Sequence, residues 1–91
     1  MPKTNNISTM FVFCFVDYHE TDGDAQMTTP KVFRTKKAAM SAFNARVKNV
    51  LEREVSPADV TNRIEGDGYL HLCVNDKDHY TIYVKRVKVI E

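Results

Sequence analysis

The most informative pattern along the chain is a strand near the N-terminus that is apolar on both sides. Residues 9–18 are rich in aromatic and β-branched side chains, and Phe11, Phe13 and Phe15 share one face. The residues between them form a second apolar face: Val12, Cys14, Val16 and Tyr18. An ordinary antiparallel strand has one wet face, so this pattern predicts a central strand that is covered on both sides.

A hairpin is expected directly after this strand. The dipeptide Asp22-Gly23 predicts a tight turn, because glycine tolerates the positive φ that such turns require. The strand that follows, about 25–34, contains Pro30, which has no N–H to donate to a ladder. We therefore expect this second strand at a sheet edge or at a bulge.

After Thr35 the apolar spacing changes to that of a helix. Thr35 is a suitable N-cap, and the spacing predicts a main helix over about 36–53. Its apolar stripe consists of Ala39, Met40, Phe43, Val47, Val50 and Leu51. Ser56 and Pro57 then predict a short helical turn over about 57–64, because serine caps helices and proline fits the first helical position.

The last third of the chain alternates again and predicts two strands, over 69–74 and 80–90, around a turn at 75–78. The expected fold class is therefore α+β: a four-stranded antiparallel sheet of two hairpins, one main helix and a short helical turn, in the order ββααββ. Residues 1–8 are polar and predict a flexible N-terminal arm, and residues 9–91 predict a single domain.

Composition and charge narrow the classes of function. The chain has 91 residues, of which 43% are hydrophobic and 27% charged, as in ordinary globular domains. A net charge of +1 argues against a polybasic nucleic-acid binder and against an acidic mimic of nucleic acid. The apolar run 10–16 is too short to span a membrane, and no secretory cleavage site follows it, so we expect a cytoplasmic protein with reduced cysteines and no membrane partner.

One candidate site for chemistry is formed by His71 and Cys73, which lie two apart on a strand and so share a face that Cys14 can join. A zinc site usually takes four ligands from closely spaced pairs, whereas His19 and His79 fall in separate turns. A buried thiol beside a half-exposed histidine is the simpler interpretation. We therefore expect no catalytic residue, no metal, no cofactor and no enzyme activity.

Two basic clusters are candidate binding sites. Arg34, Lys36 and Lys37 surround the start of the main helix, where the macrodipole favours anions, so Arg34, Thr35, Lys36 and Lys37 form a candidate anion or partner-binding site. A second basic patch lies on the last strand: Lys85, Arg86 and Lys88. Long basic side chains also simply solvate a surface or protect a sheet edge. A nucleic-acid binder would need both clusters on one face.

A resemblance to known proteins emerges from the order of short motifs. The aromatic strand is followed by Phe33-Arg34-Thr35-Lys36-Lys37-Ala38, by Gly68-Tyr69 and by the strand Tyr80–Val84. Between Phe11 and Val89 the chain resembles small uncharacterised hairpin–helix–hairpin proteins of bacteria and their phages or mobile elements. The resemblance implies an interaction protein, including inhibitors of bacterial defence systems, and it transfers no functional residue.

The two apolar faces of the first strand raise the question of what covers the second one, because one helix covers only one face of a sheet. The short helix after Ser56, the N-terminal arm and a second copy of the protein are the candidates, and we favour a homodimer packed through the sheet or its edge. The expected function is a non-catalytic module that binds a protein partner. A nucleic-acid-binding protein is the alternative, and a small enzyme with a Cys/His site comes third.

Overall fold

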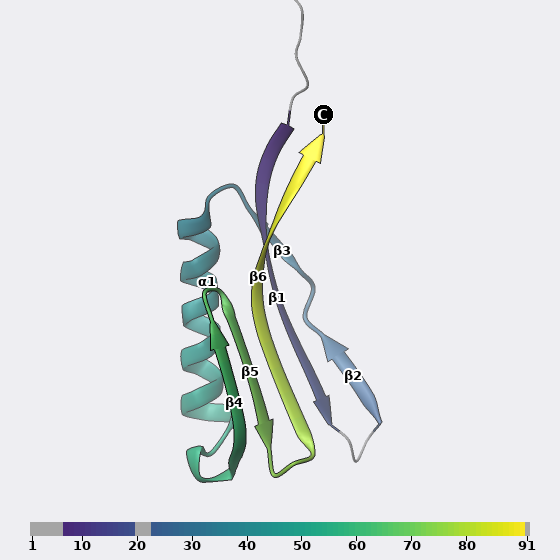
Figure 1. The fold of residues 1–91 in the computed structure, drawn as a ribbon, viewed down its shortest axis with the longest axis vertical. Coiled ribbons are helices and arrows are strands. Elements are labelled where there is room, and N and C mark those ends of the chain that lie inside the picture. The colour runs from purple at the N-terminus through teal and green to yellow at the C-terminus, as the bar shows by residue number, and fades with distance from the viewer. Residues whose placement is uncertain (1–6, 20–22, 91) are drawn as a thin grey trace, which may run out of the picture.

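The computed structural model describes residues 7–19 and 23–90, which form a single antiparallel sheet with one long helix along one side of it (Figure 1). In chain order the elements are β1 (Ile7–His19), β2 (Asp24–Met27), β3 (Lys31–Phe33), α1 (Lys36–Asn49), β4 (Val60–Gly66), β5 (Tyr69–Val74) and β6 (Asp78–Ile90). A π-helical turn, Val50–Glu54, continues α1, and a 3-10 turn, Pro57–Asp59, precedes β4.

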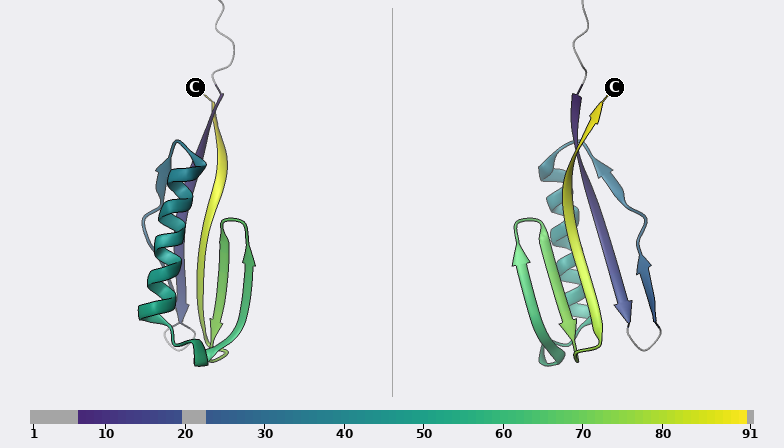
Figure 2. Two further views of the ribbon diagram at one scale, coloured as in Figure 1. Left: turned by 90° about the vertical axis from the view of Figure 1, so that its left-hand side faces the viewer. Right: turned by 45° about the vertical axis from the view of Figure 1, so that its right-hand side comes forward.

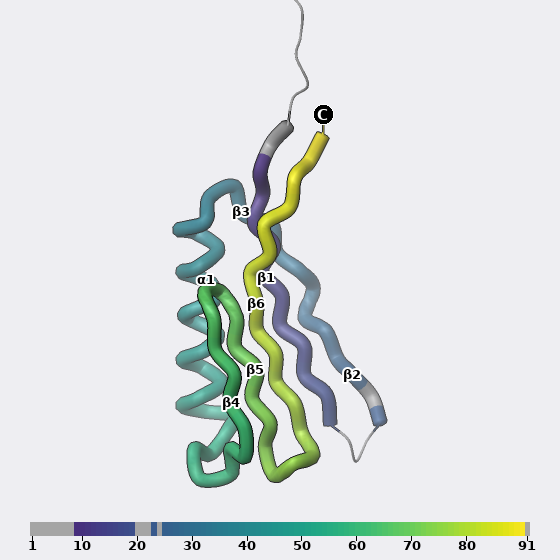
Figure 3. The backbone as a smooth tube through the Cα atoms, in the orientation of Figure 1, coloured from purple at the N-terminus to yellow at the C-terminus, as the bar shows by residue number. Residues whose placement is uncertain are grey.

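The sheet has the strand order β2-β1-β6-β5-β4, and β3 pairs with β1 farther along the same edge as β2. The central strands β1 and β6 run side by side over their full lengths, from Ile7 opposite Ile90 to His19 opposite Asp78 (Figure 3). Residues 28–30 interrupt the edge strand between β2 and β3. Pro30 therefore lies at an edge and at a break in the ladder, as its missing N–H predicts.

The helix begins where its cap predicts. The Oγ1 atom of Thr35 accepts a hydrogen bond from the N–H of Ala38 at 3.1 Å, and α1 starts at Lys36. The helical segment then continues through the π-helical turn to Glu54, close to the predicted end at 53. In that wider turn the N–H of Val55 donates to the carbonyl of Val50 at 2.9 Å, and both valines are buried.

The predicted helical turn over 57–64 is wrong. Only Pro57–Asp59 is helical, and Val60–Gly66 forms β4, which pairs with β5. Asp67 and Gly68 form the turn of the β4–β5 hairpin. Because β4 is added and the predicted second strand is divided into β2 and β3, the sheet has six strands rather than four. The element order is βββαβββ rather than ββααββ.

The core lies between the helical segment and one face of the sheet. Residues that pair directly across an antiparallel ladder point to the same side, so odd-numbered residues of β1 share the helix side with even-numbered residues of β5 and β6. The buried cluster on this side consists of Phe13, Phe15, Phe43, Val50, Val55, Leu70, Leu72, Val74 and Ile82. The other members of β1, β5 and β6 point to the opposite side.

The start of β1 and the end of β6 extend past the N-terminal end of α1 as a two-stranded ribbon (Figure 1). The segments 7–10 and 87–90 pair with one another, whereas β3 and β5 end their pairing at Phe11 and Tyr83. Of the expected N-terminal arm, residues 1–6 lie outside the described residues, and Ile7 and Ser8 already belong to β1. Within the described ranges there is no helix long and apolar enough to cross a membrane.

Gly68 supplies a test of this packing, because it occupies a tight turn against the helix. Its φ is +67°, and an added Cβ would lie 3.4 Å from both Met40 Sδ and Val84 Cβ. We expect Gly68→Ala to lower the free energy of unfolding by about 1 kcal/mol or more, because the left-handed conformation is unfavourable for alanine. Urea denaturation measures this change. Gly66→Ala is the control, since its Cβ would meet only Tyr69 Cβ at 3.8 Å. Equal midpoints for the two variants would contradict this account.

Candidate functional site: the open face of the sheet

The side of the sheet opposite α1 is crossed by none of the described segments (Figure 2). We call this side the open face. Register assigns to it the following described residues: Met10, Val12, Cys14, Val16 and Tyr18 of β1; Ala25 and Met27 of β2; Val32 of β3; Asn62 and Ile64 of β4; Tyr69, His71 and Cys73 of β5; and His79, Thr81, Tyr83, Lys85, Val87 and Val89 of β6. In this set Lys85 is the only side chain that is formally charged at pH 7.

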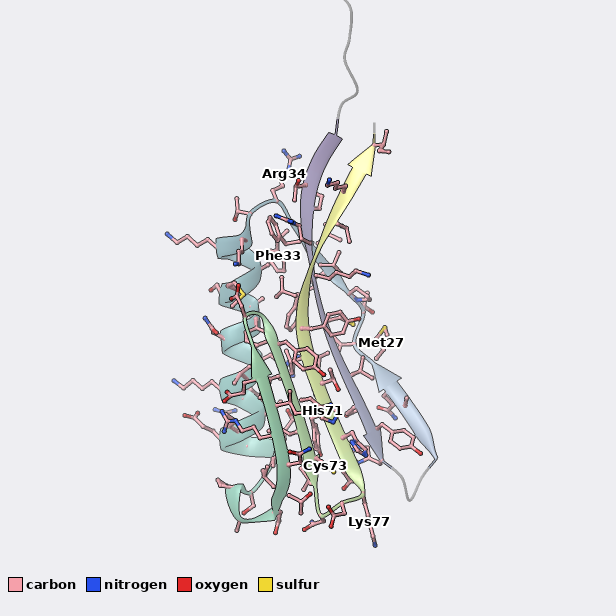
Figure 4. The ribbon with its side chains drawn as sticks, in the orientation of Figure 1. Met27, Phe33, Arg34, His71, Cys73 and Lys77 are labelled. Atoms are coloured by element: carbon pink, nitrogen blue, oxygen red, sulfur yellow. The ribbon has the colours of Figure 1, made fainter. Side chains whose placement is uncertain are left out.

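Exposed apolar side chains concentrate on the open face. Among the described residues, six large apolar side chains are more than a third exposed, and five of them belong to the open face: Met27, Val32, Ile64, Tyr69 and Val89. The sixth, Ile90, lies at the end of the ribbon. Met27 on β2 and His71 on β5 lie on either side of the central pair (Figure 4). The exposed apolar side chains of the open face therefore lie on β2 and β3 at one edge of the sheet, on β4 and β5 at the other, and at the end of β6.

Polar groups near the middle of the open face are paired with one another. One hydrogen bond joins His71 Nδ1 to Thr81 Oγ1 at 2.9 Å, and another joins His71 Nε2 to His79 Nδ1 at 3.3 Å. The ring of Tyr18 packs beside that of His79, with centroids 5.9 Å apart. The neighbouring Cys14 side chain, together with burial, raises the pKa of Tyr83.

His71 and Cys73 share the open face, as their spacing predicts (Figure 4). His79 joins them, because it lies opposite Cys73 on β6 and not in a separate turn. Cys14 is on the same side but on β1, with β6 between it and β5. Across residues 7–19 and 23–90, no group of three or more His, Cys, Asp or Glu side chains is placed to hold a metal ion.

A second cluster, on the helix side, was not anticipated from the sequence. His19 Nδ1 lies 3.2 Å from Asp78 Oδ1, and His19 Nε2 lies 3.7 Å from Asp17 Oδ2. Burial, followed by the charges of Asp78, Glu54 and Asp17, raises the pKa of Tyr80, whose ring meets that of His19 edge to face. His19 is the last residue of β1 and not part of a turn as predicted, so it shares a face of the sheet with Asp17. Asp78 is brought to them by the register of β1 with β6.

The first basic cluster is partly engaged within the fold. The Thr35 hydroxyl caps α1, and Lys36 Nζ lies 2.7 Å from Asp67 Oδ2, while Arg34 and Lys37 are exposed. A pocket of about 260 Å³ brings Lys36 together with Arg86 over an apolar floor. The floor is formed by Phe11, Met40 and Val84.

The second basic patch is divided by the alternation of β6. Lys85 points to the open face, whereas Arg86 and Lys88 point to the helix side. Of the second basic patch, therefore, only Arg86 and Lys88 lie on the same side of the sheet as the first basic cluster. Binding of an anion or a partner at Arg34, Thr35, Lys36 and Lys37, or at Lys85, Arg86 and Lys88, stays a prediction.

No protein-family model matches the chain, and neither the search of curated proteins nor that of solved structures finds a similar protein. The functional inference is therefore drawn from the chain's own residues, above all from those of the open face.

The histidine pair predicts how stability depends on pH. Burial, and secondarily the charge of His79, lowers the pKa of His71 below its ordinary value near 6.5. The unfolded chain then binds a proton at His71 in a pH range where the folded chain does not, so the free energy of unfolding falls as the pH drops below about 6.5. We expect the urea midpoint to decrease between about pH 7.5 and about pH 5.5.

His71→Gln isolates this contribution, because the amide keeps hydrogen-bonding capacity on β5 but does not titrate. We expect the variant to lose less stability than the wild type over the same pH interval. An equal decrease in both proteins would show that other groups are responsible for the pH dependence.

Proposed function

We propose that the protein is a non-catalytic interaction module that binds a protein partner through the open face. The observation that supports this proposal best is the location of the exposed apolar side chains, five of which gather on that one face. Soluble monomers rarely expose continuous apolar patches of more than a few hundred Å², and larger patches mark interaction sites. A sheet face that contacts only water would instead carry mainly polar residues, which alternate along each strand with the apolar residues of the covered face.

The composition of the open face favours protein over nucleic acid. Recognition of a phosphate backbone depends on several Lys and Arg side chains, and the open face has only Lys85. Nucleic-acid binding on the helix side has one observation in its favour, the pocket shared by Lys36 and Arg86. Lys36 is already paired with Asp67, however, so that pocket offers less positive charge than its side chains suggest.

Hydrogen bonding in the open face does not favour an enzyme with a Cys/His site. A nucleophilic thiol needs a histidine nitrogen within hydrogen-bonding reach to accept its proton. Both ring nitrogens of His71 are engaged, by Thr81 and by His79, and neither is paired with Cys73. We therefore assign no catalytic residue.

The resemblance of the motif order to small proteins of bacteria, phages and mobile elements extends the proposal. It suggests a phage- or mobile-element-encoded inhibitor or accessory protein that acts in the cytoplasm. Inhibition by occupying the surface of a target would use a broad apolar face rather than a catalytic cleft.

Capture experiments with paired variants test the proposal. Met27 and Val32 are 59% and 62% exposed, so replacing both with lysine leaves the core intact. We expect proteins captured from a bacterial lysate by the immobilised wild type to be recovered about tenfold less, or worse, with Met27→Lys/Val32→Lys, because interface cores exclude charge.

The matched control is Ser41→Lys/Asn44→Lys, which adds the same charge on exposed positions of α1. The control variant should capture as the wild type does. Equal capture by all three proteins would contradict an interaction surface on the open face. Recovery of nucleic acid that disappears as salt is raised would instead support the alternative function.

A further inference from the structure

We propose that the partner covering the open face is a second copy of this chain, packed sheet against sheet about a twofold axis. This inference rests on the proposed function, because it uses the same face and identifies its occupant. A twofold interface places the same patch on both subunits, so the patch must be compatible with itself in shape and charge. The open face meets both conditions.

The dimensions of the open face favour a broad, flat occupant. Five strands lie side by side in the order β2-β1-β6-β5-β4, with six residues of β5 paired along their whole length with β6. At about 4.8 Å between strands and about 3.3 Å per residue, the face covers on the order of 500 Å² in projection. A standard interface buries about 800 Å² of accessible surface per partner. Because side chains stand out from the sheet, the accessible area of the open face exceeds its projected area. An occupant must still cover nearly all of the face to bury a standard interface, as a sheet of the same width does.

The charge of the open face is also compatible with self-association. Lys85 is its only formally charged side chain, and it lies opposite Val12, beyond the end of β5. A lysine stem can lie along apolar surface while its ammonium group reaches solvent. Two such faces need no opposite charges to match one another, and the net charge of +1 per chain produces little repulsion between copies.

The edge strands β2, β3 and β4 are not suited to pairing with another chain. On one side the edge strand is interrupted at residues 28–30, which include Pro30. On the other side β4 has an irregular register between Val60 and Asn62, and its exposed Arg63 and Glu65 form an ion pair at 2.8 Å. Interruptions, proline and charge at an edge oppose edge-to-edge pairing. Association through the open face avoids these obstacles.

Residues 1–6 are an unsuitable cover on composition alone. Residues 1–6 read Met-Pro-Lys-Thr-Asn-Asn and contain one large apolar side chain. Burying the apolar side chains of five strands requires a comparable number of apolar partners. A second open face supplies them, and these six residues do not.

The oligomeric state of the full chain tests the inference. We expect light scattering after size exclusion to give twice the 10.5 kDa mass of the chain at high concentration, with dissociation on dilution. Met27→Lys/Val32→Lys should raise the dissociation constant at least tenfold, and Ser41→Lys/Asn44→Lys should leave it unchanged. A monomer at every concentration, or a dimer that the open-face variant retains, would overturn the inference.

Cys73 gives a second measurement that needs no substitution. Its side chain is partly exposed on the open face, whereas Cys14 is buried. We expect the rate at which a thiol reagent modifies Cys73 to fall as the protein is concentrated, because the second copy covers it. A rate that is independent of concentration in a confirmed dimer would move the interface to another surface.

The two proposals fail in different ways. If the protein is monomeric but Met27→Lys/Val32→Lys still abolishes capture of another protein, the open face is an interaction surface and only its occupant has been misassigned. If the protein is monomeric and the open-face variant captures as the wild type does, both proposals are wrong.

Discussion

The pairing of β1 with β6 is the interaction on which the rest of the structure depends. These strands come from the two ends of the chain, yet they pair without interruption from Ile7 and Ile90 to His19 and Asp78. β2 and β3 are held against the outer side of β1, and β5 and β4 against that of β6. Because the paired residues are far apart in sequence, closing this ladder carries a large loss of chain entropy, which the apolar packing on its helix side offsets.

The same pairing creates the open face. It sets Phe13 and Phe15 beside Val84 and Ile82 on the helix side, and by strand alternation it sets Cys14 beside Tyr83 on the other. A single helix packs against one face of a sheet, so α1 leaves the opposite face without a covering layer. The uncovered apolar residues follow from the number of helices available to the described chain and not from loose packing, since the buried side chains opposite are at most 7% exposed.

Local signals predicted much of the fold and little of the site. The cap at Thr35, the helix that follows it and the edge position of Pro30 each depend on residues close in sequence, and all three are present. β4 was missed because Val60 and Ile64 fit both a helical and a strand spacing, and because the irregular register after Val60 disrupts the alternation that marks a strand. His79 beside His71, and Asp78 beside His19, depend on how distant strands align, which no local pattern encodes. The sequence could have predicted that Lys85 and Arg86 lie on opposite sides of the sheet, since neighbouring residues on a strand point to opposite sides.

The hydrogen bonds between polar side chains of the open face distinguish it from a solvent-exposed sheet face, whose polar groups bond to water. Covering a polar group without a partner costs free energy, whereas a group that is already hydrogen-bonded loses little when water is removed. His71 is hydrogen-bonded to Thr81 and to His79, so these groups keep their partners when the surface is dehydrated. The lowered pKa of His71 favours its uncharged form, which further reduces the cost of covering it. The open face thus combines uncovered apolar side chains with polar groups that are satisfied from within, and both properties favour burial against another protein surface.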